Sequence, residues 1–280
     1  MKIGILVFLT DYSVDVAAYA RSMEEMGFES LWVPEHPVLP ADKTVFPYSD
    51  DGAMPKVYSD IVDPFIALAH ASAVTSTLKL GTGICLVPER NPLLLAKEVA
   101  TLDLYSQGRF LFGIGAGWHR SEIEIMGGDF DHRWTQTRES VLAMKELWTK
   151  VESEFHGEHY DFPPVYSFPR PVQRPHPPVL LGGRAANVFR RVVAWGDGWI
   201  PAALEPDKIS AGRAELARLA EAAGRDPDSI SISAVWDRPD RDMIRRFEDA
   251  GADRLIVQVA TSPEAEALAE LEEIAEEAIV

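Results

Sequence analysis

The segment Gly182-Gly183-Arg184 has the residue types of an anion site. It follows a short apolar run at 179–181 and precedes a predicted helix at 185–194. Free backbone N–H groups and the positive end of the helix dipole would therefore face a bound anion. The Arg184 guanidinium would add a charge-assisted hydrogen bond. This segment is the best predicted phosphate site in the chain.

A histidine follows the second predicted strand directly, in a long connecting segment. His36 can donate a hydrogen bond to a ring nitrogen or carbonyl and can exchange a proton near neutral pH. A histidine that only binds loop carbonyls would fit the position equally well. Glu35 is either the orienting partner of His36 or a solvated side chain. Trp118, beyond the fourth predicted strand, would wall a ring pocket or simply fill space.

The ends of the predicted strands lack the groups that several enzyme classes need. They hold no lysine for a Schiff base and no facing carboxylate pair for glycoside hydrolysis. No Gly-x-Ser-x-Gly motif occurs, and His156 and His159 have no cysteine or carboxylate framework for a metal. Cys85 is predicted to be a buried packing residue. Glycine, tryptophan, histidine and small apolar residues remain, which suit a flat aromatic ligand with a polar tail.

Glycines gather after three predicted strands. The middle group resembles a dinucleotide fingerprint, but its spacing is wrong and the acidic residue that should follow is missing, so a Rossmann site is rejected. Glycine at such points lets the backbone approach a ligand or simply allows tight packing. The groups are Gly81-Thr82-Gly83, Gly113-Ile114-Gly115-Ala116-Gly117 and Gly182-Gly183.

Eight β-branched runs, each followed by an amphipathic stretch, must position these residues. This count predicts an α/β fold, a (β/α)8 TIM barrel in one domain spanning 1–280, ahead of a doubly wound sheet. The predicted strands are 2–9, 30–33, 78–85, 109–114, 179–181, 198–201, 229–235 and 254–257. The predicted helices are 14–26, 64–75, 92–105, 135–151, 185–194, 206–223, 240–250 and 263–279.

The connecting segments are unequal. Those at 34–62 and 115–134 are long and would lie on the C-terminal face, where barrel active sites are built. The proline-rich segment 152–178 is predicted to be an extended spacer. Three pairs place a capping residue before a proline at the first helical position, namely Asp63-Pro64, Asn91-Pro92 and Ser262-Pro263.

The charge balance excludes some partners. With 27 basic and 44 acidic residues, the formal charge of −17 opposes nucleic acid binding. The apolar start at 2–9 is predicted to be a buried strand rather than a signal peptide, and no run of about 18 apolar residues predicts a membrane span. A single cysteine excludes an intrachain disulfide and favours the cytoplasm.

Several stretches resemble the luciferase-like monooxygenase superfamily, and within it the branch of probable coenzyme F420-dependent oxidoreductases. The resemblance runs from residue 1 to about 201 and is most specific over 80–118. It implies a (β/α)8 barrel, commonly a homodimer, with a cofactor on the C-terminal face. The stretches are LWVPEH (31–36), FPYSDDG (46–52), LGTGICLVPERNPLLLAKEVATLDLYSQGRFLFGIGAGW (80–118), FHGEHYDF (155–162), PRPVQRPHPPVLLGG (169–183) and GDGW (196–199).

The resemblance also implies roles for particular residues. A non-prolyl cis peptide that supports the cofactor ring maps to Gly83-Ile84, where glycine suits the backbone. The histidine near the reactive centre maps to His36, and the phosphate-binding turn maps to Gly182-Gly183-Arg184. A polar contact maps near Ser121 or Glu122. Trp118 stands where relatives often carry an acidic residue, and it joins Gly115 among the expected cofactor contacts.

The sequence therefore predicts hydride transfer between a deazaflavin, coenzyme F420, and a small organic substrate, with proton exchange at His36. An FMN-dependent monooxygenase is the main alternative, since a Glu-His pair after strand two also occurs in that branch. A barrel that binds flavin or deazaflavin without turnover is a third hypothesis. A cofactor-free phosphate-binding barrel is the fourth.

Overall fold

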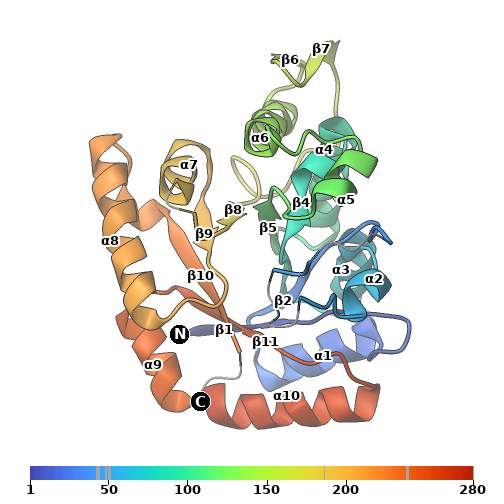
Figure 1. Ribbon diagram of the computed structural model, residues 1–280, viewed down its shortest axis with the longest axis vertical. Helices are drawn as coiled ribbons and strands as arrows, with labels where there is room; N and C mark the ends of the chain where they lie inside the picture. Colours follow the sequence, from blue (N-terminus) through green and yellow to red (C-terminus); the bar gives the residue numbers. More distant parts are fainter. Residues whose placement is uncertain (42–44, 48, 50–51, 186, 238–239, 280) are drawn as a thin grey trace.

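The computed structural model describes residues 1–41, 45–47, 49, 52–185, 187–237 and 240–279. Within them, eight strands pair in parallel in the order β3-β2-β1-β11-β10-β9-β8-β5, and β5 pairs with β3 to close the ring. Helices surround the ring (Figure 1), so the predicted (β/α)8 barrel is confirmed. The barrel strands are β1 (Lys2–Leu6), β2 (Ser30–Val33), β3 (Lys79–Thr82), β5 (Phe110–Gly115), β8 (Val179–Gly182), β9 (Gly198–Ile200), β10 (Ser231–Trp236) and β11 (Arg254–Gln258).

The predicted strand 78–85 is in fact two strands. β3 ends at Thr82, and the short β4 (Cys85–Leu86) pairs with the last residues of β5. Between them the Gly83-Ile84 peptide is cis, as the family resemblance implies. The first strand is also shorter than predicted, because β1 ends at Leu6.

Two of the three predicted proline caps are confirmed. The Asp63 carboxylate accepts from the Ile66 N–H and Asn91 accepts from the Leu93 N–H. Ser262 does not cap, because the last helix begins at Glu264 and the Ser262 carbonyl accepts from the Val14 N–H instead. The helices are α1 (Val16–Met26), α2 (Val57–Asp60), α3 (Pro64–Ser72), α4 (Pro92–Tyr105), α5 (Arg120–Ile125), α6 (Arg133–Thr149), α7 (Val188–Trp195), α8 (Pro206–Ala222), α9 (Arg241–Asp249) and α10 (Glu264–Ala278), with 3₁₀ turns η1 (Val87–Glu89) and η2 (Pro227–Ser229).

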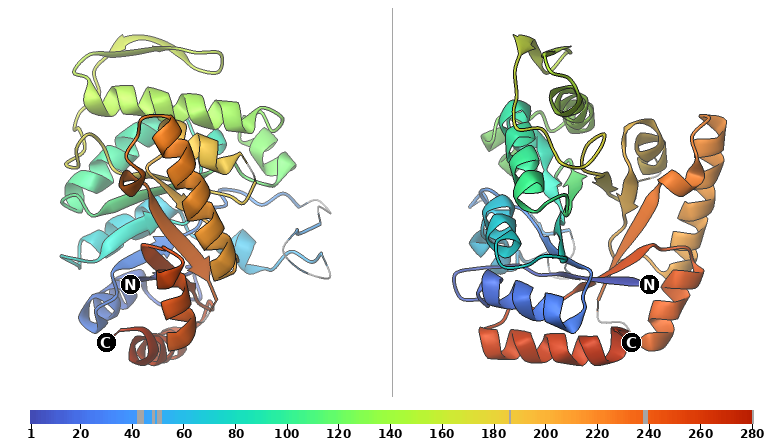
Figure 2. Two further views of the ribbon diagram at one scale, coloured as in Figure 1. Left: turned by 90° about the vertical axis from the view of Figure 1, so that its left-hand side faces the viewer. Right: turned by 180° about the vertical axis from the view of Figure 1, so that it is seen from behind.

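The proline-rich segment is not uniformly extended, contrary to prediction. It begins with an antiparallel hairpin, β6 (Ser153–His156) and β7 (Asp161–Val165), which lies beyond α6 (Figure 2). The Phe155 and Phe162 rings stack with centroids 6.3 Å apart, and the Glu139 carboxylate of α6 accepts from the His159 N–H at 2.7 Å. The ring contact stabilises the pairing of β6 with β7, and the hydrogen bond from His159 attaches the hairpin to α6.

The barrel interior is filled around one tryptophan. Trp32 is fully buried, and its indole N–H donates to Ser30 Oγ at 2.8 Å. A Cβ at Gly81 would lie 2.2 Å from the Trp32 ring, so glycine at 81 makes room for it. Inward residues of other strands complete this layer, and they are Leu6, Leu111, Leu180, Ile200, Val235 and Ile256. The interior is a packed core and the base of any site above it.

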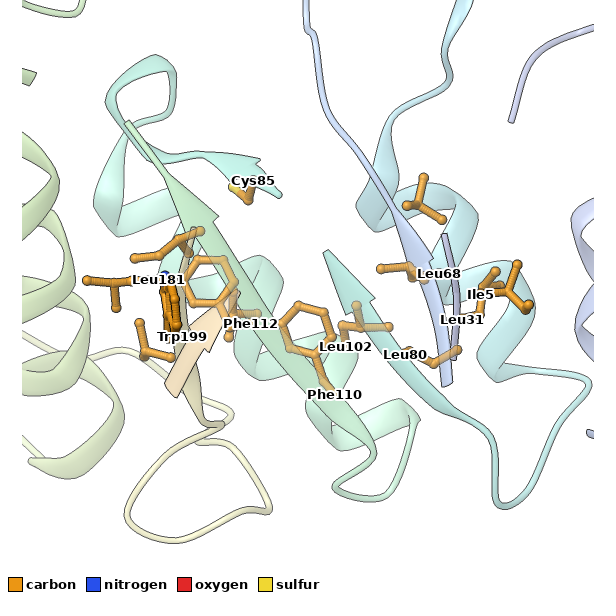
Figure 3. Close-up of a cluster of buried hydrophobic side chains, with 14 of the residues drawn as sticks. Ile5, Leu31, Leu68, Leu80, Cys85, Leu102, Phe110, Phe112, Leu181 and Trp199 are labelled. Carbon is orange, nitrogen blue, oxygen red and sulfur yellow. The ribbon is translucent and has the colours of Figure 1, made fainter. Parts of the chain in front are cut away.

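A second apolar layer lies between the strands and the helices. Outward residues alternate with inward ones, as in β5, where Phe110 and Phe112 belong to this layer (Figure 3). Leu111, between them, belongs to the interior layer around Trp32. Leu68 of α3 and Leu102 of α4 belong to this layer. Cys85 is buried in it, as predicted. None of the helices in the described part of the chain is long and apolar enough to cross a membrane.

An ion pair joins strands at the N-terminal end of the barrel. Arg254, which starts β11, donates to both carboxylate oxygens of Glu29 at 2.6 Å and to Ser233 Oγ at 2.8 Å. Burial raises the pKa of Glu29, but the hydrogen bonds and charge of Arg254 offset this and hold that pKa below its ordinary value.

Breaking this pair should destabilise the barrel. We expect Arg254→Met to cost about 3–5 kcal/mol in urea unfolding, because Glu29 is left charged and largely buried. Arg218→Gln is the control, since its pair with Glu215 is exposed and is worth under about 1 kcal/mol. Equal costs for the two variants would contradict a structural role for the Glu29–Arg254 pair.

Candidate functional site

A cavity of about 670 Å³ opens at the C-terminal ends of the strands. Every barrel strand or the segment after it contributes to its lining. Each residue predicted for the site lines it except Ser121 and its alternative Glu122. The lining comprises Leu6, Phe8, Pro34, Glu35, His36, Pro47, Ser49, Tyr58, Gly83, Ile84, Leu86, Gly115, Ala116, Gly117, Trp118, Trp134, Gly182, Gly183, Arg184, Ile200, Ala202, Ala203, Val235 and Gln258.

His36 of the lining forms a pair with Glu122, which lies outside the lining. His36 Nδ1 lies 2.7 Å and 3.0 Å from the two carboxylate oxygens of Glu122. The side chains are 7% and 1% exposed, so the pair is shielded from solvent. Glu122 lies in α5, and its N–H donates to the His119 ring at 3.4 Å. A carboxylate at Nδ1 fixes the orientation of the imidazole and favours the tautomer with its proton on Nδ1.

Aromatic rings surround His36 on one side of the cavity. Its ring centroid is 5.2 Å from that of Tyr58 and 6.1 Å from that of Trp118. Phe46 contacts both Tyr58 and Trp118, at 4.9 Å and 5.6 Å. These edge contacts fix the ring of His36 and make this wall of the cavity largely apolar.

Glu35 takes neither of the roles predicted for it. The side chain is buried, and it accepts from the Leu86 N–H and from Arg90 Nε, both at 2.7 Å. Arg90 also pairs with Asp63 and Glu98. Glu35 therefore joins the end of β2 to the segment after β4, and Glu122 is the residue that holds His36.

A second buried acid lies behind the His–Glu pair. Glu89 of η1 is 3% exposed, and neither of its carboxylate oxygens has a hydrogen-bond partner among the described residues. Burial, followed by the negative charges of Glu122 and Glu35, raises the pKa of Glu89 to about 9, although Arg90 opposes this. Glu89 is therefore protonated at neutral pH.

One wall of the cavity is shaped by glycines around a single isoleucine. A Cβ at Gly115 would lie 2.0 Å from Ile84 Cδ1, and one at Gly182 would lie 3.0 Å from it. Glycine at both positions lets the Ile84 side chain pack down between β5 and β8. The glycines thus serve tight packing, and Ile84 forms an apolar part of the cavity wall.

The predicted anion turn lies at the opposite edge of the cavity. Gly183 has a φ of 127°, and its carbonyl accepts from the Trp199 indole N–H at 2.7 Å. Arg184 is exposed at the rim. The helix starts later than predicted, since α7 begins at Val188, so its dipole is three residues further from the turn. Gly183 and Arg184 are therefore the nearer groups for an anion.

Several residues of the site were missing from the sequence-based prediction or were predicted with another role. Ser121 does not line the cavity, whereas its neighbour Glu122 binds His36. Tyr58 and Trp134 line it without having been predicted. Tyr58 lies in the short helix α2, within the connecting segment predicted at 34–62, while Trp134 is the second residue of α6, one position before the helix predicted at 135–151. Only the fold brings them to the cavity.

Comparisons with known proteins identify the family of the chain. The family model described as luciferase-like monooxygenase matches residues 10–278. An uncharacterized protein of Mycobacterium tuberculosis is 34% identical over 280 residues, which cover 98% of each chain. The F420-dependent glucose-6-phosphate dehydrogenase of Amycolatopsis mediterranei is 30% identical over 237 residues, which cover 80% of this chain and 66% of that protein.

A solved structure shows the same fold. A monooxygenase from Streptomyces bottropensis superposes with a TM-score of 0.81, at 21% identity, and the match covers 100% of this chain and 99% of that one. At this identity the likeness concerns the fold alone.

The raised pKa of Glu89 predicts a pH dependence of stability. The unfolded chain releases this proton near the ordinary glutamate pKa of 4.5 and the folded chain near 9, so the free energy of unfolding falls with rising pH between those values. Glu89→Gln removes this loss, and we expect it to gain about 2–4 kcal/mol over the wild type between pH 5 and pH 8.

Chemical unfolding at the two pH values measures this gain. The exposed Glu124→Gln, on the same helix as Glu122, is the control and should show a difference from the wild type that is nearly independent of pH. A Glu89→Gln difference that is equally flat would mean that Glu89 is ionised in the folded chain.

Proposed function

Because the chain belongs to the luciferase-like monooxygenase family, we propose that it is an oxidoreductase that transfers a hydride between coenzyme F420 and a small organic substrate. The observation that carries the proposal is the buried His36–Glu122 pair, whose His36 lines a cavity with the apolar Ile84 in its wall. The homodimer and the cytoplasmic location expected from the sequence stay predictions.

The residues present fit a deazaflavin or flavin. The volume of about 670 Å³ falls within the range of cofactor sites, and its lining is mostly apolar with a few polar groups. Ile84, packed over Gly115 and Gly182, would hold one face of a planar ring. Gly183 and Arg184 would hold a phosphate at the far edge. When bound, the deazaflavin supplies the two-electron chemistry.

His36 would exchange the proton that accompanies hydride transfer. Glu122 engages Nδ1, which leaves proton exchange with a substrate to Nε2. The carboxylate of Glu122 stabilises the imidazolium that forms when Nε2 takes up a proton. Burial of both side chains strengthens this interaction, since solvent screens it little.

An FMN-dependent monooxygenase is the second candidate, because the same wall and the same anion turn would accept a flavin with a terminal phosphate. Side-by-side titrations of the purified chain with F420 and with FMN, followed by fluorescence, decide between them. We expect tight binding of F420 and weaker binding of FMN. A preference for FMN would refute the deazaflavin proposal.

Arg184 should contribute to the affinity for the cofactor. We expect Arg184→Ala to weaken F420 binding by about 1.5–3 kcal/mol, since it removes a charge-assisted bond to phosphate. Arg218→Ala, on the outer helix α8, is the matched control and should bind as the wild type does. An unchanged dissociation constant in Arg184→Ala would remove Arg184 from the site.

The His–Glu pair should affect turnover more than binding. We expect Glu122→Gln to lower kcat by about 10²-fold with the identified substrate, because a neutral amide stabilises imidazolium poorly. The dissociation constant of the cofactor should change little. Glu124→Gln again serves as the control. Full turnover in Glu122→Gln, or a loss confined to binding, would show that the pair has only a structural role.

A further inference from the structure

The strand order gives the cavity two sides of different chemistry. Around the closed ring, β3, β5 and β8 are neighbours, and β2, β1 and β11 are neighbours. The ends of the first group carry Ile84, packed over Gly115 and Gly182, and the Gly183-Arg184 turn. We call this the β5 side, and the proposed function places the cofactor there. The β1 side comprises the ends of β1, β2 and β11 and the segment 34–62.

Aromatic rings line the β1 side next to His36. Phe8 follows β1 and Tyr58 lies in α2, and both line the cavity. Their ring centroids are 5.2 Å apart, and the Tyr58 centroid is also 5.2 Å from that of His36. Phe46, which is buried, packs edge-on against Tyr58 at 4.9 Å. Phe8 and Tyr58 therefore form an aromatic wall that reaches the imidazole.

A polar side chain from β11 lies beside this wall. Gln258 ends β11, lines the cavity and is exposed. The segment after it runs along the segment after β1, since the Val259 N–H donates to the Leu6 carbonyl at 3.0 Å. Further along, Thr261 Oγ1 donates to the Phe8 carbonyl at 2.9 Å. The Gln258 amide can both donate and accept a hydrogen bond, and it carries no charge.

The polar lining of the β1 side suits an uncharged ligand. Besides His36 and Glu35, the described residues of this side add two hydroxyls and one amide, those of Ser49, Tyr58 and Gln258. Arg90 pairs with the carboxylate of Glu35. Burying a charged ligand group is costly unless an opposite charge meets it, whereas a buried hydroxyl or carbonyl needs only a hydrogen bond.

We propose that the β1 side binds the substrate, and that the substrate is an uncharged, mainly apolar ring compound with one hydroxyl or carbonyl group. Its ring would lie against Phe8 and Tyr58, which removes apolar surface of all three from water. Its oxygen would face His36 Nε2, with the Gln258 amide as a second hydrogen-bonding group. This inference rests on the proposed function, because it names the substrate of the hydride transfer proposed above.

The alternative is that the aromatic wall only supports His36 while a charged substrate binds elsewhere in the cavity. Substitutions at Tyr58 distinguish the two roles. Tyr58→Phe keeps the ring and loses the hydroxyl, whereas Tyr58→Ala loses both. If the ring contacts the substrate, the first change is tolerated and the second weakens substrate binding without weakening cofactor binding.

Calorimetric titrations of the full chain saturated with F420 test the substrate class. The ligands are acetophenone, an uncharged aromatic ketone, and glucose 6-phosphate, a charged sugar. We expect acetophenone to bind with a negative heat-capacity change, which marks burial of apolar surface. Glucose 6-phosphate should not compete with it. This comparison uses the wild type alone and decides the class even if a variant is unstable.

The variants test the aromatic wall. Tyr58→Ala should weaken acetophenone binding about five-fold or more and reduce the heat-capacity change, and Tyr58→Phe should bind within about two-fold of the wild type. The affinity for F420 should stay within about two-fold in both variants. Tyr166→Ala, which removes an exposed ring that is not part of the lining, is the control.

The outcomes separate this inference from the proposed function. If F420 binds and glucose 6-phosphate displaces acetophenone, or acetophenone does not bind, the substrate class is refuted and the proposed function stands. Equal acetophenone binding by the wild type and Tyr58→Ala would refute the aromatic wall. An equal loss of F420 and acetophenone affinity in Tyr58→Ala would refute the division of the cavity into two sides.

If F420 does not bind the wild type, the proposed function fails, and the chain alone is titrated with acetophenone. Binding that is lost in Tyr58→Ala and kept in Tyr58→Phe would support a ring-binding site on the β1 side. Binding that is absent, or equal in the wild type and both variants, would refute that site as well.

Discussion

The structure depends on filling the barrel interior around Trp32. A ring of eight strands leaves a space that side chains must occupy, and here one indole takes much of it. Gly81 must then lack a side chain, since a Cβ there would overlap the Trp32 ring. With Leu6, Ile200 and Val235 also inside, the top of this packed layer becomes the base of the cavity. His36 lies four residues after Trp32, so the packing of Trp32 in β2 fixes where the segment that carries His36 leaves the barrel.

A second constraint is the surplus of buried acids around one arginine. Arg90 binds Glu35 and also pairs with Asp63 and Glu98, so little of its charge is left for Glu89 or Glu122. Glu122 and Glu89 are accommodated in different ways. Glu122 is held by His36, and Glu89 keeps its proton. One extra buried acid near Glu122 is thereby accommodated as a neutral carboxyl.

The sequence predicts the barrel well because alternation of strands and helices is a local pattern, and the strand ends follow from it. The lining of the cavity by glycines after the strands could be predicted for the same reason, whereas anion binding at Gly182-Gly183-Arg184 stays a prediction. The partner of His36 could not, because Glu122 reaches it across 86 positions and Glu35 lies next to it in sequence. Adjacent residues on an extended chain point in opposite directions, which is why Glu35 reaches Arg90. The hairpin at 153–165 was missed because its prolines favour extended chain, while Glu139 of another helix holds its turn.

The net charge of the chain and the chemistry of its cavity oppose each other. A formal charge of −17 repels an anionic ligand at long range. At physiological ionic strength, however, charges beyond about 8 Å are largely screened, so the acidic outer helices act weakly at the rim. Arg184 lines the cavity, and the part of the chain that the structure describes gives it no ion-pair partner. Affinity for an anion is therefore decided by a few local donors. The distant acids slow its approach without cancelling its binding.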